Sequence, residues 1–331
     1  MKSRWCLIFV GFLLSCHSER AELRKAVDGT AASIEAEMVG VRKALGALSA
    51  EIRDTYDKEA TLDLTTSKLD AADGGPFKSF EDGKFYVKSE RKGASFYVSP
   101  WKPDDEPLKR TLRFLLYTEP ALVRASTSSE LLRMTFYGVH EPQSIAMLCP
   151  WFDTVSNFPP GLDLRNFEWY RRGLESSGRA LWSAAPFTDL ANGWVVDLAE
   201  PVISHGAHRG VGVISVSMAK LNQKYLSQEK ANLLLLGSDL TLLGQTPSAR
   251  ATSGLHELEL VTLLQQTKEN TFVPGRFKLD DATQPADAKE LARRVKSGAS
   301  DFELGLGGQQ RRFAVARVGE TGFFVIGFRN R

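Results

Sequence analysis

A proline-free stretch from residue 18 to residue 56 constrains the fold more than any other part of the sequence. Apolar residues recur along it three and four positions apart, which places them on one face of a helix. They are Val27, Ala31, Ile34, Met38, Val41, Leu45, Leu48 and Ile52. This stripe is compatible with a coiled-coil seam and with a long helix laid along a globular body. Three glycines within the stretch weaken the coiled-coil alternative, because small side chains bury little surface.

The residues before this helix have the layout of an export signal. Lys2 and Arg4 precede an apolar run from Trp5 to Leu14. About ten apolar residues cannot cross a hydrocarbon core that needs roughly 20, so the run is typical of a secretory signal peptide. It ends in Leu13-Leu14-Ser15-Cys16, which resembles a bacterial lipobox. Residues 1–16 are therefore predicted to be a lipoprotein signal with Cys16 as the lipidated residue; the alternative is an ordinary signal peptide with a chance cysteine.

Composition limits the classes of protein that remain. The chain has 331 residues, of which 43% are hydrophobic and 25% charged, and this excludes a disordered or polytopic membrane protein. A formal net charge of +2 gives no reason to expect nucleic acid as a partner. If Cys6 leaves with the signal and Cys16 carries lipid, Cys149 is the one remaining thiol, and we expect it to be a small buried hydrophobe.

The remaining sequence predicts two sheet-bearing segments after the long helix, which we place at residues 17–59. The first, residues 60–217, has a predicted helix at 108–123, strands at 84–87, 95–98, 131–139, 193–196 and 210–214, and a loop at Ser204–His208. The second, residues 218–331, has strands at 232–236, 240–243, 302–306, 311–318 and 323–328, and helices at 218–229, 255–268 and 286–296. A hairpin, a helix and three antiparallel strands form the order of a small PAS-like module, so the fold class is α+β with two tandem modules.

One stretch within the first module resembles the double Cache (dCache) sensor domains of bacterial chemoreceptors and histidine kinases. It reads Leu162-Asp163-Leu164-Arg165-Asn166-Phe167-Glu168-Trp169-Tyr170, where the family has an Asp-x-Arg-x-Arg-Pro-Trp-Tyr run. Pro186-Phe187-Thr188-Asp189, Gly193-Trp194-Val195-Val196, Pro201-Val202 and Gly210-Val211-Gly212-Val213 follow in the family's order. The resemblance implies a ligand pocket in a membrane-distal module, here residues 60–217, and a membrane-proximal module at residues 218–331.

The residues expected to bind the ligand differ from those of the family members that bind amino acids. Phe167 stands where those members have the arginine that binds the ligand carboxylate, and Leu162 stands where they have a tyrosine. Ser215 stands where they have the aspartate that takes the ligand's ammonium group. An apolar ring cannot replace a guanidinium that binds a carboxylate through two hydrogen bonds. Under this resemblance, free α-amino acids are not the expected ligands.

The residues that remain suggest an aromatic pocket with one carboxylate. Trp169, Tyr170, Phe167 and Phe187 offer apolar faces, and Asp189 offers a hydrogen-bond acceptor. Such a pocket suits a small cation, or a ring that carries a hydrogen-bond donor. The competing interpretation is that these aromatic side chains fill a core and that Asp189 forms a turn.

No group of residues in the sequence predicts catalysis, a cofactor or a metal. His205 and His208 have a metal-compatible spacing, but histidines in a glycine-containing loop are more often solvated. Gly305-Leu306-Gly307-Gly308 lies between two predicted strands and is expected to be a hairpin, since a phosphate-binding loop opens a helix. We therefore expect a binding protein.

Architecture leads to two hypotheses about function. The first is a lipid-anchored sensory protein that binds a ligand and signals this binding to a membrane histidine kinase or chemoreceptor. A partner is expected because the predicted elements include neither a second membrane helix nor an output module. The second is a structural or interaction lipoprotein that keeps the fold without a ligand. The long helix is the expected docking or homodimer surface. His17 is not the aspartate that often retains lipoproteins at the inner membrane, so we expect the periplasm or the outer membrane and cell surface.

Overall fold

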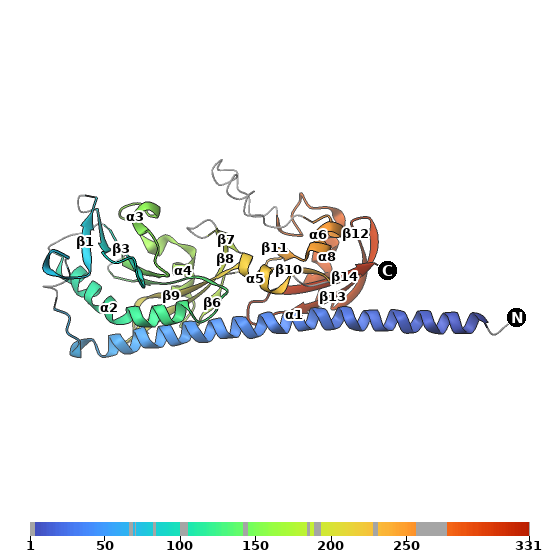
Figure 1. The fold of residues 1–331 in the computed structure, drawn as a ribbon, viewed down its shortest axis with the longest axis horizontal. Coiled ribbons are helices and arrows are strands. Elements are labelled where there is room, and N and C mark those ends of the chain that lie inside the picture. Colours follow the sequence, from blue (N-terminus) through green and yellow to red (C-terminus); the bar gives the residue numbers. More distant parts are fainter. Residues whose placement is uncertain are drawn as a thin grey trace. The chain divides into compact units, whose positions relative to one another are not determined.

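A computed structural model describes residues 4–65, 69, 71–81, 84–99, 105–141, 145–183, 186–188, 193–227, 231–255 and 277–330 (Figure 1). The side chains of residues 4–17, 73, 187 and 188 are outside this description. The chain divides into two compact units. One comprises residues 39–183 and 195–217, and we call it the seven-stranded unit. The other comprises residues 1–38, 184–194 and 218–331, and we call it the five-stranded unit.

Helix α1 (Arg4–Asp57) contains the predicted long helix and contributes to both units. All eight residues of its apolar stripe are at most 5% exposed within this one chain. In the seven-stranded unit, Leu45 and Ser49 lie against Gly212, where an added Cβ would be 3.3 Å from the Leu45 side chain. In the five-stranded unit, Val27 and Leu23 lie against Gly327. The stripe therefore packs on the chain's own sheets, as the globular-body alternative predicts, and the coiled-coil alternative is wrong.

The seven-stranded unit is built on a largely antiparallel sheet with the main order β3-β5-β4-β9-β8-β6. Its strands are β3 (Ser95–Val98), β4 (Leu132–Val139), β5 (Ile145–Cys149), β6 (Leu181–Trp182), β8 (Trp194–Ser204) and β9 (Ala207–Ser217). Strand β7 (Phe187–Thr188) pairs with β8, although its residues belong to the segment 184–194 that is grouped with the other unit. Beside it lie the hairpin β1 (Phe77–Phe80) and β2 (Phe85–Lys88), the helices α2 (Glu106–Ser126), α3 (Thr154–Asn157) and α4 (Glu168–Glu175), and the short helices η1 (Glu59–Thr61), η2 (Ala71–Asp73) and η3 (Leu164–Asn166). Figure 1 shows α2 beside the C-terminal part of α1, where Tyr56 stacks on Phe114 with ring centres 4.0 Å apart.

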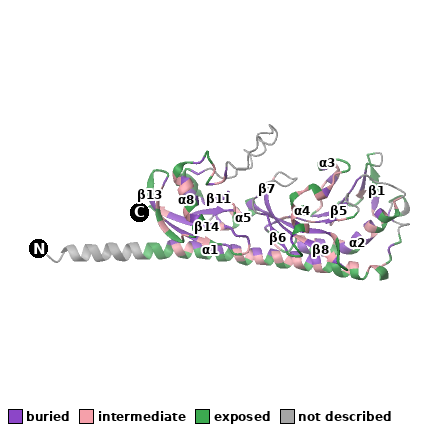
Figure 2. Ribbon diagram, turned by 180° about the vertical axis from the view of Figure 1, so that it is seen from behind, coloured by how far each residue is buried: buried purple, intermediate pink, exposed green. Residues whose placement is uncertain are grey.

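The five-stranded unit has an antiparallel sheet with the order β11-β10-β14-β13-β12. Its elements are α5 (Met218–Tyr225), β10 (Asn232–Leu236), β11 (Leu242–Gln245), α6 (Pro247–Ser253), α8 (Ala286–Lys296), β12 (Asp301–Leu306), β13 (Gln309–Arg317) and β14 (Phe324–Asn330). Side chains of α8 and of the inner sheet face form its core. Figure 2 shows the buried residues concentrated in the strands. The predicted hairpin, helix and three closing strands are present, although the helix predicted at 255–268 lies outside the described residues beyond Leu255.

Two sequence predictions of local structure are wrong. The loop predicted at Ser204–His208 is mostly strand, because Ser204 ends β8 and Ala207 begins β9. Only His205 and Gly206 make the turn, both with positive φ (51° and 76°), which is the backbone of a tight two-residue hairpin. The helix predicted to reach residue 229 ends at Tyr225.

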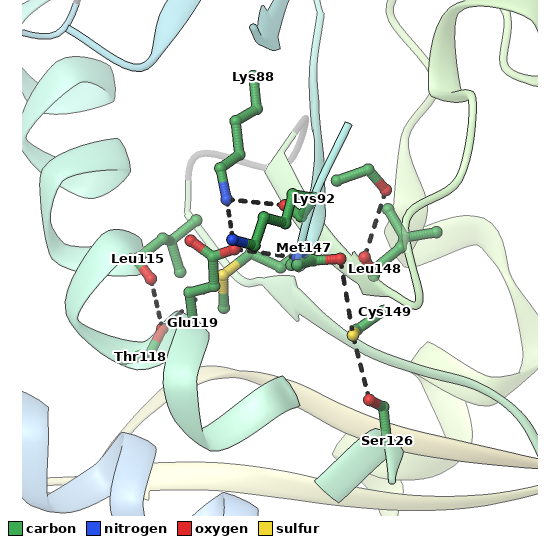
Figure 3. Close-up of polar contacts among 12 residues, drawn as sticks. Lys88, Lys92, Leu115, Thr118, Glu119, Ser126, Met147, Leu148 and Cys149 are labelled. Atoms are coloured by element: carbon green, nitrogen blue, oxygen red, sulfur yellow. Dashed lines mark hydrogen bonds and ion pairs between the residues drawn. The ribbon is translucent and has the colours of Figure 1, made fainter. Parts of the chain in front are cut away.

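Cys149 ends β5 as the predicted small buried residue, with 4% of its surface exposed. Its Sγ lies 3.1 Å from Ser126 Oγ, and burial raises the pKa of the thiol (Figure 3). Beside it, the Nζ of Lys88 and the Oε1 of Glu119 form an ion pair at 2.5 Å. These contacts join α2 to β5 and to β2.

Candidate functional site

One face of the larger sheet brings together the residues that the sequence singles out. Side chains alternate along β4, β8 and β9, so Phe136, Val213 and Ala199 share a face. Helix α4 covers this face closely: a Cβ at Gly173 of α4 would lie 2.4 Å from a methyl group of Val211. The opposite face is covered by α1, as the contact of Leu45 with Gly212 shows. The sheet thus has one face for the long helix and another for the candidate site.

Trp169 occupies the centre of an aromatic group on this face. Its ring meets that of Phe136 edge-on with centres 4.8 Å apart, and those of Phe167 and Tyr170 lie at 6.2 Å and 5.3 Å. A Cβ at Gly138 would approach Trp169 Cη2 to 2.9 Å, so the indole lies directly on the strand backbone. Trp169 and Phe167 remain partly exposed, so they present apolar surface as well as filling space.

Tyr170 differs from its neighbours because it is completely buried. Its hydroxyl lies 3.1 Å from Nδ1 of His140, at the end of β4. Burial raises the pKa of Tyr170, with the charge of Arg165 opposing that effect. At neutral pH the neutral phenol is a hydrogen-bond donor or acceptor to the imidazole. Tyr170 therefore fixes α4 against the strand ends and contributes little free surface.

Ser215 and Asp197 form a buried polar pair on the same sheet face. They are direct partners in the β8–β9 register, with 3% and 2% of their surfaces exposed. The Oγ of Ser215 donates a hydrogen bond to the Oδ1 of Asp197 at 2.6 Å. On the other side of Ser215 the register partner is Met134 of β4, two residues before Phe136. The pair thus places a carboxylate and a hydroxyl on the same sheet face as the aromatic group.

Asp197 is the residue that sequence reasoning missed. An acidic side chain in the middle of the apolar strand Trp194-Val195-Val196-Asp197-Leu198 was a usable signal, because carboxylates are seldom buried without a specific role. Sequence spacing gave no sign that it lies opposite Ser215, since 18 residues separate the two.

The predicted site residues are only partly visible in the structure. Phe167, Trp169 and Tyr170 lie together, and Ser215 lies on the same sheet face. Asp189 and the side chain of Phe187 lie outside the described residues. The assignment of these six residues to a ligand site stays a prediction.

Arg165, which precedes Phe167 by two positions, is held by carboxylates. Its Nε is 3.0 Å from Oδ1 of Asp163, and its Nη1 is 3.0 Å from Oε1 of Glu141. The hydrogen bond from Arg165 lowers the pKa of Asp163. A guanidinium already paired in this way is a poor substitute for the arginine that the family has at position 167.

The two histidines of the β8–β9 turn do not face each other as metal ligands would. His205 lies 3.4 Å from Asp57, while the ring of His208 lies 6.3 Å from that of His140. In the part of the chain that the structure describes, no group of three His, Cys, Asp or Glu side chains could hold a metal ion. Among the same described residues, we find no helix with the length and apolarity needed to cross a membrane.

Solved structures that match nearly the whole chain are ligand-binding domains of chemoreceptors, and this chain has their double Cache fold. The sensory domain of the Campylobacter jejuni chemoreceptor Tlp3 with isoleucine bound has a TM-score of 0.53 and 11% identity, covering 95% of this chain and 93% of that one. The ligand-binding domain of the Pseudomonas fluorescens chemoreceptor CtaA in complex with L-isoleucine has a TM-score of 0.52 and 13% identity, covering 95% of each chain.

The Tlp3 domain in complex with L-norvaline is similar to the same degree, with a TM-score of 0.52, 12% identity, and coverage of 95% of this chain and 91% of that one. No protein-family model and no curated protein matches the sequence. At these identities the likeness establishes the fold, and the predicted α+β class with a long N-terminal helix and two modules is confirmed.

Proposed function

We propose that the chain is an exported, lipid-anchored sensory protein, with no enzymatic activity, that binds a small molecule bearing an N–H donor or a positive charge. The pocket would lie over the sheet face of the seven-stranded unit, which corresponds to the membrane-distal module. The observation that carries this proposal is the buried pair Asp197 and Ser215 on an otherwise apolar sheet face. The carboxylate already accepts from Ser215, and a ligand amine would add a charge-assisted hydrogen bond to this pair.

Other residues on this sheet face suit such a ligand. The partly exposed faces of Trp169 and Phe167 can contact a cation or an apolar ring. We assign Phe187 to the same apolar wall and Asp189 to a second acceptor, as the sequence predicts. Tyr170 would act by positioning α4, because its hydroxyl already contacts His140.

Free α-amino acids fit this pocket poorly, although two of the similar chemoreceptor domains were solved with L-isoleucine or isoleucine. An α-amino acid brings a carboxylate as well as an ammonium group. Phe167 offers the carboxylate no donor, and Arg165 is occupied by Asp163 and Glu141. An amine, a quaternary ammonium compound or a purine lacks that carboxylate, and the aromatic group favours these classes.

Thermal shift on the full chain tests the proposal with a panel of small amines, quaternary ammonium compounds, purines and organic acids. A ligand at 100 times its Kd adds about 2.7 kcal/mol of stability, which raises the Tm by roughly 5–10 °C for units of this size. Asp197→Asn is expected to weaken binding of the compound found at least tenfold, because a charge-assisted hydrogen bond is lost. Asp189→Ala is expected to weaken it as well.

Asp153→Asn is the matched control in the same unit. Asp153 caps α3 by accepting from Ser156 N, and asparagine caps a helix equally well. Binding should be unchanged in this variant. Equal binding by the wild type, Asp197→Asn and Asp189→Ala would contradict the site, and a flat response to the whole panel would favour the structural lipoprotein alternative.

Relay to a membrane histidine kinase or chemoreceptor and attachment through Cys16 belong to the same proposal. The double Cache fold supports the relay, since the similar solved domains belong to chemoreceptors. The buried stripe of α1 is not available for a dimer, so a homodimer through this helix would use its outer face, where Gly29, Ala32 and Gly40 are exposed.

A further inference from the structure

A cavity of about 320 Å³ lies at the end of the sheet in the seven-stranded unit. Its lining comes from α1, η1, α2, the end of β4 and the start of β9, and consists of Tyr56, Glu59, Arg110, Thr111, Phe114, His140, Glu141, His208 and Arg209. None of Trp169, Asp197 and Ser215 lines it, so it is separate from the proposed amine site. Ligand pockets measure about 300–1,000 Å³, and this cavity therefore suits a small molecule.

The sheet fixes the backbones of two residues of this cavity beside each other. The backbone nitrogen of His140 donates to the backbone oxygen of Arg209 at 2.9 Å, next to the last register pair of β4 and β9. The same oxygen accepts from the hydroxyl of Tyr137 at 2.9 Å. A site built on such positions is ordered before a ligand arrives, which lowers the entropy cost of binding.

The guanidinium of Arg209 is stacked on an aromatic ring and has no ion pair. Its central carbon lies 5.0 Å from the centre of the Tyr56 ring, which in turn stacks on Phe114. In the part of the chain that the structure describes, no carboxylate pairs with it. Its Nε is buried without a hydrogen-bond partner, so a ligand would meet the edge formed by the two Nη atoms. That edge can bind an oxyanion through two parallel hydrogen bonds.

The two carboxylates that line the cavity are paired with other arginines. Oε1 of Glu59 lies 3.2 Å from Nη2 of Arg110, and Oε1 of Glu141 lies 3.0 Å from Nη1 of Arg165. Of the two arginines described in the lining, Arg209 is thus the one whose charge has no bonded partner. Its positive charge would attract an anion into the cavity.

Two imidazoles add hydrogen-bond donors that do not share the plane of the guanidinium. The rings of His140 and His208 have centres 6.3 Å apart and are tilted by 55°. The hydroxyl of Tyr170 lies 3.1 Å from Nδ1 of His140 and can donate to it, and the imidazole then carries its proton on Nε2. His208 is exposed, so its ring is accessible to a ligand that enters from solvent.

We propose that this cavity binds a small molecule through a phosphate group. The guanidinium of Arg209 would engage two phosphate oxygens, and a third oxygen, out of their plane, would accept from an imidazole of His140 or His208. A carboxylate has no such third oxygen. Inorganic phosphate and a phosphate monoester share this chemistry. The site does not depend on the proposed amine ligand.

Thermal shift and calorimetry of the full chain test the proposal with inorganic phosphate and glycerol 3-phosphate. Sodium acetate and sodium chloride at the same ionic strength are the anion controls. At least one phosphate probe is expected to raise the Tm by about 3 °C or more in a saturable manner, and the control anions are not. The probe with the higher affinity shows whether the ligand is the free ion or an ester. Arg209→Gln should lower this affinity about tenfold or more, because it removes the charge and the planar fork.

Arg53→Gln is the matched control. Arg53 is exposed on α1, about one turn before Tyr56, and does not line the cavity. Its replacement removes the same charge from the same unit, and the phosphate response should remain. Asp197→Asn should also keep that response, because it alters the amine site alone.

Four results would overturn the proposal. The first is that neither phosphate probe gives a saturable change in Tm. The second is that acetate binds as tightly as the phosphate probes. The third is that Arg209→Gln still responds, and the fourth is that Arg53→Gln loses the response equally. If Arg209→Gln does not fold, Arg209→Lys keeps the charge without the fork and should bind about fivefold more weakly or worse. If neither variant folds, Arg209 has a structural role and the proposal fails.

Discussion

Gly93 is a single position at which backbone conformation and a buried ion pair depend on each other. Its φ of +71° lies in the left-handed region, and a Cβ there would lie 2.5 Å from Oε1 of Glu119. That oxygen accepts from Ala94 N at 2.9 Å and pairs with Lys88, whose side chain is 12% exposed (Figure 3). Any side chain at Gly93 must therefore displace a carboxylate that is already committed to two donors.

Gly93→Ala is expected to lower the free energy of unfolding by about 2–4 kcal/mol. The left-handed backbone contributes roughly 1–2 kcal/mol, and the disturbed ion pair contributes the rest. Gly178→Ala is the control, because Gly178 has φ +84° and nothing within 4 Å of an added Cβ. It should cost only the backbone part. Urea denaturation of both variants measures the difference, and equal losses would show that the ion pair plays no part.

The sequence predicted which single residues are buried better than it predicted which residues contact each other. Cys149 is the buried hydrophobe that the apolar run around it indicates. Trp169 and Tyr170 lie together because they are adjacent on α4. Asp197 and Ser215 could not be paired from sequence, because a shift of one residue in the β8–β9 register would move one of them to the other face. The turn does not fix that register alone, because a bulge between Val202 and Ile203 shifts it by one residue, and the turn was predicted too long.

Helix α1 shows how two faces of one element can differ in their response to mutation. Leu45 is fully buried against the sheet, while Gly40 is exposed and has nothing within 4 Å of an added Cβ. Both positions belong to the seven-stranded unit. The periodicity of the sequence is enough to predict which of the two is buried.

Gly40→Ala should stabilise the seven-stranded unit by about 0.5–1 kcal/mol, since glycine costs that much in a helix interior. Leu45→Ala should destabilise it by about 2–5 kcal/mol, because it leaves a cavity against the sheet. Melting curves should show a small rise in Tm for the first and a clear fall for the second. A fall for both would mean that Gly40 is covered by a partner.

Elements with strong periodicity were predicted best. The helix at 286–296 has the predicted bounds, and the strands near 95–98, 132–139 and 232–236 lie where the apolar runs place them. Strand β1 (Phe77–Phe80) was missed inside a polar stretch, because only its first residue is buried and no alternation marks it. Short strands that rely on a neighbour for pairing leave little trace in sequence.

At the scale of the whole molecule, the order of the elements predicted two tandem modules, and the stretch from Leu162 to Tyr170 added the resemblance to the double Cache fold. The similar solved structures confirm that fold. The boundaries at 59/60 and 217/218 stay predictions. Lipid attachment also stays a prediction. It depends on a short motif in the signal sequence, which the fold of the rest of the chain does not test. The ligand depends on a few side chains, so fold likeness alone does not identify it.

Cys16→Ala should release the chain from membranes or block its processing. The cysteine is the acylation site of the predicted lipobox, and one acyl-bearing residue is the only predicted membrane anchor. Membrane fractionation of cells that express the wild type and the variant measures the effect, with Cys149→Ala as the control for loss of a thiol. Unchanged membrane partition of Cys16→Ala would contradict lipid anchoring.

The facing positions of Asp197 and Ser215 have a consequence for how such proteins diverge. Because the two residues lie side by side on adjacent strands, a carboxylate can move from one strand to the other in two substitutions and stay in nearly the same place. A sequence alignment would record the loss of an acidic residue at position 215, although an acidic side chain is present at the facing position on the adjacent strand. The proposed amine site therefore predicts that homologues group by whether the pair as a whole carries a negative charge, with ligands that follow this grouping.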